Sequence, residues 1–265
     1  MPVHEIRSIS QVGTVEPFNL QVARGQIPGH KLKFKFGNNL SVSDSLETIW
    51  SEGGLYVYPS SATQMTVSSS SADDTAAGTG ARTINIEGLD ADYNEISEDI
   101  ILNGQTPVTT VNSYIRINRG SVLTAGSGEK NAGIVRAGTG TVTSGVPANV
   151  FLSIDGDGDN QTLMCLWTVP AGYTAFLVQT NVSTGNASNT PALLQTTVVA
   201  RPHGGVFNTQ ERITLADGNQ LQGYNFPLRY TEKTDIEVRA KSTTTVTFDC
   251  SASLEFIYIK NDSRL

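Results

Sequence analysis

The chain has 265 residues and a formal net charge of −7, with 16% charged and 38% hydrophobic residues. The acidic balance and the lack of a basic cluster argue against a nucleic-acid partner. No apolar run approaches the ~18 residues that span a bilayer, which argues against a membrane protein. The low charge and the many Gly, Ser, Thr and Asn residues are typical of short strands separated by turns.

Residues 1–30 carry scattered apolar residues without a clean period, and Pro17, Gly25 and Pro28 interrupt them. We expect this segment to be an extended N-terminal arm that packs on a neighbouring subunit. It has no apolar core of the kind found in signal peptides, which predicts synthesis in a reducing cytoplasm.

The first module is expected at 31–138. In "KLKFKF" (31–36) lysines alternate with apolar residues, which predicts a strand with the lysines in water and Leu32, Phe34 and Phe36 in a core. Further strands are expected in "RTINIEGL", "ISEDIIL" and "YIRINRGSVL", and one at Met65–Ser68.

One short helix is expected at 43–52. Ser41 and Asp44 fit a capping box, and Leu46, Ile49 and Trp50 fall on one helical face. Residues 139–147, rich in Gly and Thr, are expected to be a linker to a second module.

The second module is expected at 148–265, and its clearest signal is strict alternation from Val246 to Tyr258. Such alternation predicts one buried and one solvated strand face, and the length of the run predicts a bend or bulge. Shorter alternating runs recur upstream, separated by turn signals. The sequence therefore predicts an all-β fold of two antiparallel β-sandwich or jelly-roll modules with an N-terminal arm and one short helix.

The stretch "SIDGDGDNQT" (153–162) raises the question of a calcium site at Asp155, Asp157 and Asp159. An EF-hand loop needs glycine at position 6 and a bidentate glutamate at position 12, where this chain has Asn160 and Leu166. A polar turn between two antiparallel strands is the favoured interpretation, because Asp and Gly tolerate positive φ. A calcium site of another type and a catalytic carboxylate pair stay open as alternatives.

No other pattern predicts chemistry. The histidines are His4, His30 and His203, and the chain contains no HExxH, GxSxG, dinucleotide-binding or phosphate-binding motif. We therefore expect no catalytic residues, no metal site, no cofactor and no enzymatic activity. Cys165 and Cys250 fall on inward-facing positions, and a reducing compartment favours free thiols, with pairing left open.

Four aromatic residues offer a second binding alternative, because aromatic faces stack on sugar rings. With aromatic residues at only 7% of the chain, we expect them to serve the cores instead. They are Trp50, Tyr56, Tyr58 and Trp167.

Three segments resemble virion structural proteins of tailed bacteriophages, especially those of marine and cyanobacterial hosts. They are "FKFGNNLSVSDSLETIWSEGGLYVY" (34–58), residues 72–135 with "DDTAAGTGAR" and "EGLDADYNE", and "TVPAGYTAFLV" (168–178) with "FPLRYTEKTDIEVRAKS" (226–242). The resemblance covers most of the chain from 34 to 260. Its sequence motifs are specific, but the resemblance includes no catalytic residues and does not fix a role in the particle.

The resemblance implies a virion protein that is not an enzyme. We expect a capsid decoration or cement protein whose partners are the major capsid protein or other virion proteins and further copies of itself, as a dimer or trimer. The alternative is a tail-associated or fibre-like protein that binds the host surface or a glycan there. A third class, a glycan-cleaving enzyme, lacks any supporting motif.

Overall fold

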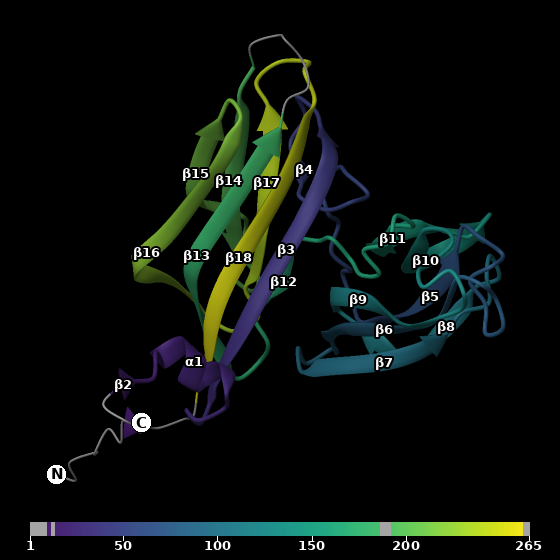
Figure 1. The fold of residues 1–265 in the computed structure, drawn as a ribbon, viewed down its shortest axis with the longest axis horizontal. Helices are drawn as coiled ribbons and strands as arrows, with labels where there is room; N and C mark the ends of the chain where they lie inside the picture. The colour runs from purple at the N-terminus through teal and green to yellow at the C-terminus, as the bar shows by residue number, and fades with distance from the viewer. Residues whose placement is uncertain (1–9, 12–13, 186–191, 262–265) are drawn as a thin grey trace.

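The computed structural model describes residues 10–11, 14–185 and 192–261, which form two β-modules beside each other (Figure 1). The expected all-β fold is confirmed, and the described residues contain one short helix, α1 (Phe18–Ala23), which lies outside the range expected for it. No helix in this part of the chain is long and apolar enough to cross a membrane.

The helix expected at 43–52 is absent, and this region forms turns around the two-residue strand β4 (Glu47–Thr48). The Glu47 carboxylate explains the difference, because it accepts hydrogen bonds from the backbone N–H and the hydroxyl of Ser43, at 2.9 and 2.7 Å. These contacts stabilise a turn around the Glu47 side chain in place of a helix.

The larger module is a sandwich of two antiparallel sheets around one core. One sheet has the strand order β16-β13-β18-β3, and the other has the order β12-β17-β14-β15, with β4 also paired to β17. Most consecutive strands cross from one sheet to the other, so the chain ties the sheets together. Besides β4, the strands are β3 (His30–Val42), β12 (Leu166–Thr168), β13 (Tyr173–Gly185), β14 (Leu194–Arg201), β15 (Asn208–Leu215), β16 (Gly218–Tyr230), β17 (Asp235–Ser242) and β18 (Phe248–Lys260).

The alternation near the C-terminus predicted β18 correctly. Every second side chain of the strand lies in the sandwich core, and the residues between them are partly exposed. The register shifts fall in the strands on either side: β13 gains a residue between Leu177 and Gln179, and β3 gains one between Asn39 and Val42. The buried set is Phe248, Cys250, Ala252, Leu254, Phe256 and Tyr258.

β3 is a strand as predicted, but its two faces are the reverse of the prediction. Leu32 and Phe34 are 41% and 56% exposed, whereas Lys35 is 4% exposed. β3 is the edge strand of its sheet, and the smaller module, not the opposite sheet, covers its inner face (Figure 1). The lysines of β3 bind polar groups of the smaller module.

The smaller module packs a four-stranded sheet, β11-β10-β5-β8, against a three-stranded sheet, β7-β6-β9. Its own core lies between them and includes Met65, Ile84, Ile117 and Leu152. The strands are β5 (Thr63–Ser69), β6 (Ala81–Leu89), β7 (Glu95–Ile101), β8 (Val108–Tyr114), β9 (Arg116–Ala125), β10 (Val135–Thr143) and β11 (Val146–Ile154). These small antiparallel sheets do not make a second jelly roll.

The smaller module is inserted at one position of one sandwich strand. β4 and β12 both pair with β17, and their partners run from Ala240 to Asp235 with a single gap at Val238. Two residues share that gap: the Ile49 N–H donates to Val238 O at 2.9 Å, and the Val238 N–H donates to Cys165 O at 3.0 Å. In an uninterrupted strand, one residue would pair with Val238. Here the chain leaves the sandwich at Ile49 and re-enters it at Cys165, so the smaller module is inserted at that one position.

Gly37 of β3 makes this crossing possible. A Cβ at position 37 would lie 2.3 Å from the Cys165 nitrogen and 2.7 Å from the Ile49 oxygen. Both are backbone atoms that cannot move aside, so only glycine lets the crossing segments pack directly on β3.

The division of the chain differs from the expected one. The first module was expected at 31–138, but β3 and β4 belong to the sandwich, and β11 belongs to the smaller module. Residues 139–147, expected as a linker, form the turn and strand ends of the β10–β11 hairpin. The glycines that suggested flexibility supply backbone turns there, with Gly145 at φ 77°.

Only part of the expected arm lies within the described residues. β1 (Ser10–Gln11) pairs with β2 (Thr14–Val15), and α1 packs against β3. Val22 of α1 is buried, whereas Phe18 is half-exposed. Packing of this arm on a neighbouring subunit stays a prediction.

Candidate functional site: the junction between the modules

The aspartates singled out in the sequence lie on the segment that leaves the smaller module after β11. Asp155, Asp157 and Asp159 line an open pocket of about 460 Å³ together with Glu47 and Glu52. Burial raises the pKa of Asp155, and the Asp157 carboxylate raises it further; the pKa of Asp159 rises for the same two reasons. Among the described residues, no three His, Cys, Asp or Glu side chains are placed to hold a metal ion.

This segment does turn at Gly156, but the strands around it do not form an antiparallel pair. β11 lies in the smaller module and β12 in the sandwich, so the loop is the exit from the insertion. The apolar residues after the aspartates divide between two cores: Cys165 and Trp167 face the sandwich core, whereas Met164 and Leu166 face the core of the smaller module.

The other sequence candidates are structural. Cys165 and Cys250 are free, buried thiols in the sandwich core. Trp50 and Tyr56 belong to the core of the smaller module, and Trp167 belongs to the sandwich core.

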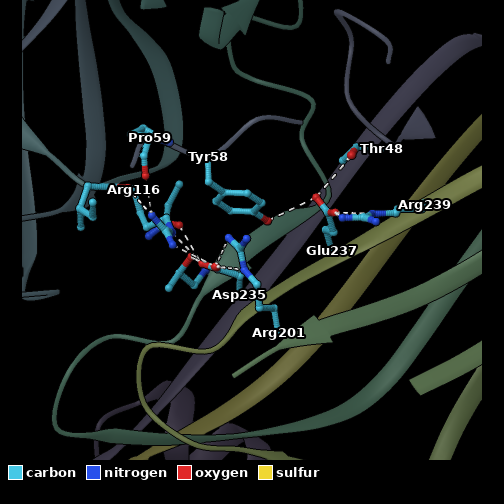
Figure 2. A network of polar contacts seen from close by, with 11 residues as sticks. Thr48, Tyr58, Pro59, Arg116, Arg201, Asp235, Glu237 and Arg239 are labelled. Carbon is cyan, nitrogen blue, oxygen red and sulfur yellow. Dashed lines mark hydrogen bonds and ion pairs between the residues drawn. The ribbon is translucent and has the colours of Figure 1, made fainter. Parts of the chain in front are cut away.

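The fourth aromatic candidate, Tyr58, lies at the junction between the modules (Figure 2). His203 packs edge-on against Tyr93, with ring centroids 5.4 Å apart. Tyr58 and His203 therefore lie where the two modules meet.

A buried carboxylate forms the centre of the junction (Figure 2). Asp235 of β17 is 2% exposed. Arg116, from β9 of the smaller module, donates to both of its oxygens at 2.7 and 3.0 Å. Arg201 of β14 donates to Oδ2 at 2.6 Å, and the Thr168 hydroxyl donates to Oδ1 at 2.6 Å. Burial by itself lowers the pKa of Arg116, but its bonds to Asp235 raise that pKa above the usual value.

A second buried ion pair lies beside the first on the same strand. Glu237 is fully buried and accepts a hydrogen bond from Arg239 Nε at 2.5 Å. Thr48 and Tyr58 donate to its other oxygen, each at 3.3 Å. Burial raises the pKa of Glu237, and the Arg239 charge opposes that rise.

Aromatic rings contact the arginines of both ion pairs. The guanidinium carbons of Arg116 and Arg201 lie over the Tyr58 ring, 4.9 and 4.8 Å from its centroid. Those of Arg201 and Arg239 lie over the Phe207 ring, at 4.6 and 4.2 Å. Cation–π contacts stabilise these like charges where water has little access.

A row of lysines on β3 completes the junction. Lys31 pairs with Glu95 at 2.9 Å, and Lys33 pairs with Glu87 at 3.6 Å. Lys35 is buried, and its ammonium donates to the backbone oxygen of Asn118. Burial, and next to it the charge of Lys33, lower the pKa of Lys35 to about 7.

Lys35 gives the junction a pH dependence. The unfolded chain holds this proton up to a pKa of ~10.4, whereas the folded protein holds it only up to about 7. Stability should therefore rise with pH from about 7 towards ~10, by roughly 2 kcal/mol between pH 7 and 9 relative to Lys35→Met. Urea midpoints of both proteins across this range test it, and parallel pH profiles would contradict it.

The "DDTAAGTGAR" stretch is organised around a further buried carboxylate, inside the smaller module. Asp74 is completely buried and accepts hydrogen bonds from the backbone N–H groups of Ala81, Ala132 and Gly133 at 2.7 to 3.0 Å. The Ser69 hydroxyl donates to it at 2.5 Å. The carboxylate thus holds three loops together, which is a structural role for this stretch.

The polar groups of the junction bind one another. This arrangement can fix the angle between the two modules. Asp235 holds two arginines and one hydroxyl, and Glu237 holds one arginine and two hydroxyls. Sequence reasoning missed this site. The fold and the junction define a class of protein: a β-sandwich with a second β-module inserted in one of its strands.

No protein-family model matches the chain, and no curated protein matches it at the significance we required. The solved structures similar to it include the VP2 subviral particle of infectious bursal disease virus, at 13% identity and a TM-score of 0.26, covering 89% of this chain and 74% of that one. The Gx strain of the same virus gives 11% identity, 96% and 79% coverage, and a TM-score of 0.26. TM-scores this low do not establish a common fold.

Proposed function

We propose that this protein is a non-enzymatic structural component of a virus particle, most specifically a capsid decoration or cement protein of a tailed bacteriophage. It binds the shell formed by the major capsid protein and associates with further copies of itself. The resemblance of residues 34–58, 72–135 and 226–242 to phage virion proteins supports this proposal. We also interpret the larger sandwich as a jelly roll with a module inserted in one strand, which agrees with its strand order.

The observation that carries the proposal is an apolar patch on the outer face of the sheet β16-β13-β18-β3. Phe176, Ile257 and Leu32 form one cross-strand row over three adjacent strands. Phe34 stacks on Phe36 with ring centroids 5.6 Å apart. We call this set the outer-face patch: Leu32, Phe34, Phe36, Phe176, Ile257 and Ile259.

A continuous apolar area on a sheet face that does not touch the protein's own cores indicates a surface buried against another protein. The patch lies beside α1 and the expected arm, since α1 contacts β3. A decoration protein needs such a face, because it folds alone in water and later covers a shell. In this proposal the outer-face patch contacts the shell, and residues 1–30 extend the contact to a neighbour.

The double variant Leu32→Ser/Phe34→Ser is expected to bind particles that lack the protein about a hundredfold more weakly than the unchanged chain. The removed side chains are 41% and 56% exposed, so the folded protein loses little while the interface loses roughly 2–3 kcal/mol. Co-sedimentation with particles at increasing protein concentration measures this affinity.

The matched control is Leu40→Ser/Val57→Ser, which removes two side chains of 72% and 69% exposure outside the patch. Equal binding by both double variants would remove the patch from the proposal. Binding of the purified protein to host cells or to lipopolysaccharide, with none to particles lacking it, would favour the fibre-like alternative. Unchanged occupancy after deletion of residues 1–30 would remove the arm.

A further inference from the structure

The two edges of the sheet β16-β13-β18-β3 are protected in different ways. β3 carries lysines along its length, and the smaller module packs beside it through the Lys31–Glu95 and Lys33–Glu87 pairs. At the opposite edge, β16 pairs with β13 on one side, and no strand of the described residues pairs with its other side. Figure 1 shows β16 on the side of the sandwich that faces away from the smaller module.

The composition of β16 is unusual for a free edge. From Gly218 to Leu228 it reads "GNQLQGYNFPL" and contains no charged residue. Leu221 and Phe226 are 55% and 89% exposed. Soluble proteins generally protect long edge strands with charges, proline or bulges, because a bare edge pairs with any available strand. Here the guards are Pro227, Arg229 and a register shift that sets the four residues 224–227 opposite the single residue Val178, and all of them lie in the second half of the strand.

We propose that β16 is the self-association edge of this protein, where two copies pair their β16 strands antiparallel about a two-fold axis. This inference rests on the self-association in the proposed function and names its surface. The joined edges would turn two four-stranded sheets into one continuous sheet. Because residues 224–227 are out of register with β13 and Pro227 lacks an N–H group, the new pairing is centred on the regular stretch 218–223.

Three observations favour a second copy over another partner. Two identical antiparallel strands related by a two-fold axis complement each other, and the pairing uses up the only bare edge of this sheet, so the dimer closes. The uncharged stretch from Gly218 to Leu228 lets two chains of net charge −7 approach. Pairing of β16 with the β3 edge of another copy is opposed by the lysines and the smaller module beside β3.

This dimer leaves the outer-face patch free. Leu32 and Phe34 lie on β3, at the far edge of the same sheet, and the row that starts at Leu32 ends at Phe176 of β13, before β16. A dimer joined through β16 therefore presents two patches on one continuous sheet. Two weak contacts with a shell would then act together, which raises the apparent affinity without any new contact.

The test compares the double variants Leu221→Lys/Phe226→Lys and Leu40→Lys/Val57→Lys by sedimentation velocity over a wide range of protein concentration. Each pair replaces two exposed apolar residues with two lysines, and one pair lies on the β16 edge. We expect a dimer for the unchanged chain and the Leu40/Val57 variant. For the edge variant we expect an unchanged circular dichroism spectrum and dimerisation weakened by about tenfold or more.

A monomeric unchanged chain at every concentration would overturn the inference, and so would an edge variant that dimerises as the control does. Particle binding of the unchanged chain is measured in parallel. A dimer that binds no particles would contradict the proposed function and leave the edge inference standing. A monomer that binds particles would contradict the edge inference and leave the proposed binding to the shell standing.

Discussion

Replacement of Asp235 by alanine is expected to lower the free energy of unfolding by about 3–5 kcal/mol, because it leaves a buried cation without its partner. Asp235 is 2% exposed, and the Arg116 side chain that it binds is 8% exposed. Arg201 and the Thr168 hydroxyl lose their acceptor as well. Urea unfolding of the full chain, compared at equal slope, measures the loss.

Two further variants sharpen this test. Asp44→Ala removes an exposed carboxylate of the same module and should change stability by less than about 0.5 kcal/mol. Arg116→Met/Asp235→Leu removes both buried charges and should recover much of the loss. A stability loss for Asp235→Ala no larger than for Asp44→Ala would show that the ionic junction does not hold the modules together.

Replacement of Asp74 by alanine is expected to cost a similar amount, about 3–5 kcal/mol, by a different route. The change leaves three backbone N–H groups and the Ser69 hydroxyl buried without an acceptor. The backbone at Gly80 packs directly on this carboxylate, since an ideal Cβ at Gly80 would lie 2.1 Å from Asp74 Oδ1.

Asp73→Ala is the matched control, since the neighbouring aspartate is exposed. Asp74→Asn should fall between the two, because one amide oxygen still accepts while its NH₂ group faces the Gly133 N–H. Equal unfolding midpoints for the Asp73 and Asp74 variants would contradict the role assigned to this carboxylate.

The strands could be predicted from the sequence where one core decides which side chains are buried. β18 is such a strand, because its neighbours lie on both sides in the same sheet and the opposite sheet covers one face. β3 shows the same alternation, but its inner face is covered by a separate module. Alternation predicts that the two faces differ, and it does not say which face meets protein.

The junction could not be predicted for a related reason. In "DIEVRA" (235–240) the apolar residues alternate with Asp235, Glu237 and Arg239, which resembles a strand with one face in water. In the folded chain, Arg116 of β9, Arg201 of β14 and a tyrosine from the connecting segment cover that face, and Arg239 of the same strand pairs with Glu237. Apart from Arg239, each partner is far away in the sequence, so no local pattern marks them.

The insertion was also hidden from the sequence. The strands on both sides of residues 139–147 alternate in the same way, and the chain re-enters the sandwich at Cys165 without any break in that alternation. The resemblance to phage proteins drew attention to "DDTAAGTGAR", but the contacts that explain Asp74 come from residues 69, 81, 132 and 133.

The junction links the fold to the proposed function. Buried ion pairs and an insertion at one strand position fix the angle between the modules. The smaller module therefore keeps a constant arrangement relative to the outer-face patch and the β16 edge of the sandwich. A protein that binds a regular shell needs such constancy, since each copy has to meet its neighbours in the same geometry.

A cryo-electron microscopy map of the intact virus particle tests the central claim most directly. The account predicts regularly spaced density for this chain over the outer surface of the head, with Leu32 and Phe34 of the outer-face patch turned towards the shell. Density confined to the tail, or the absence of this chain from purified particles, would contradict it.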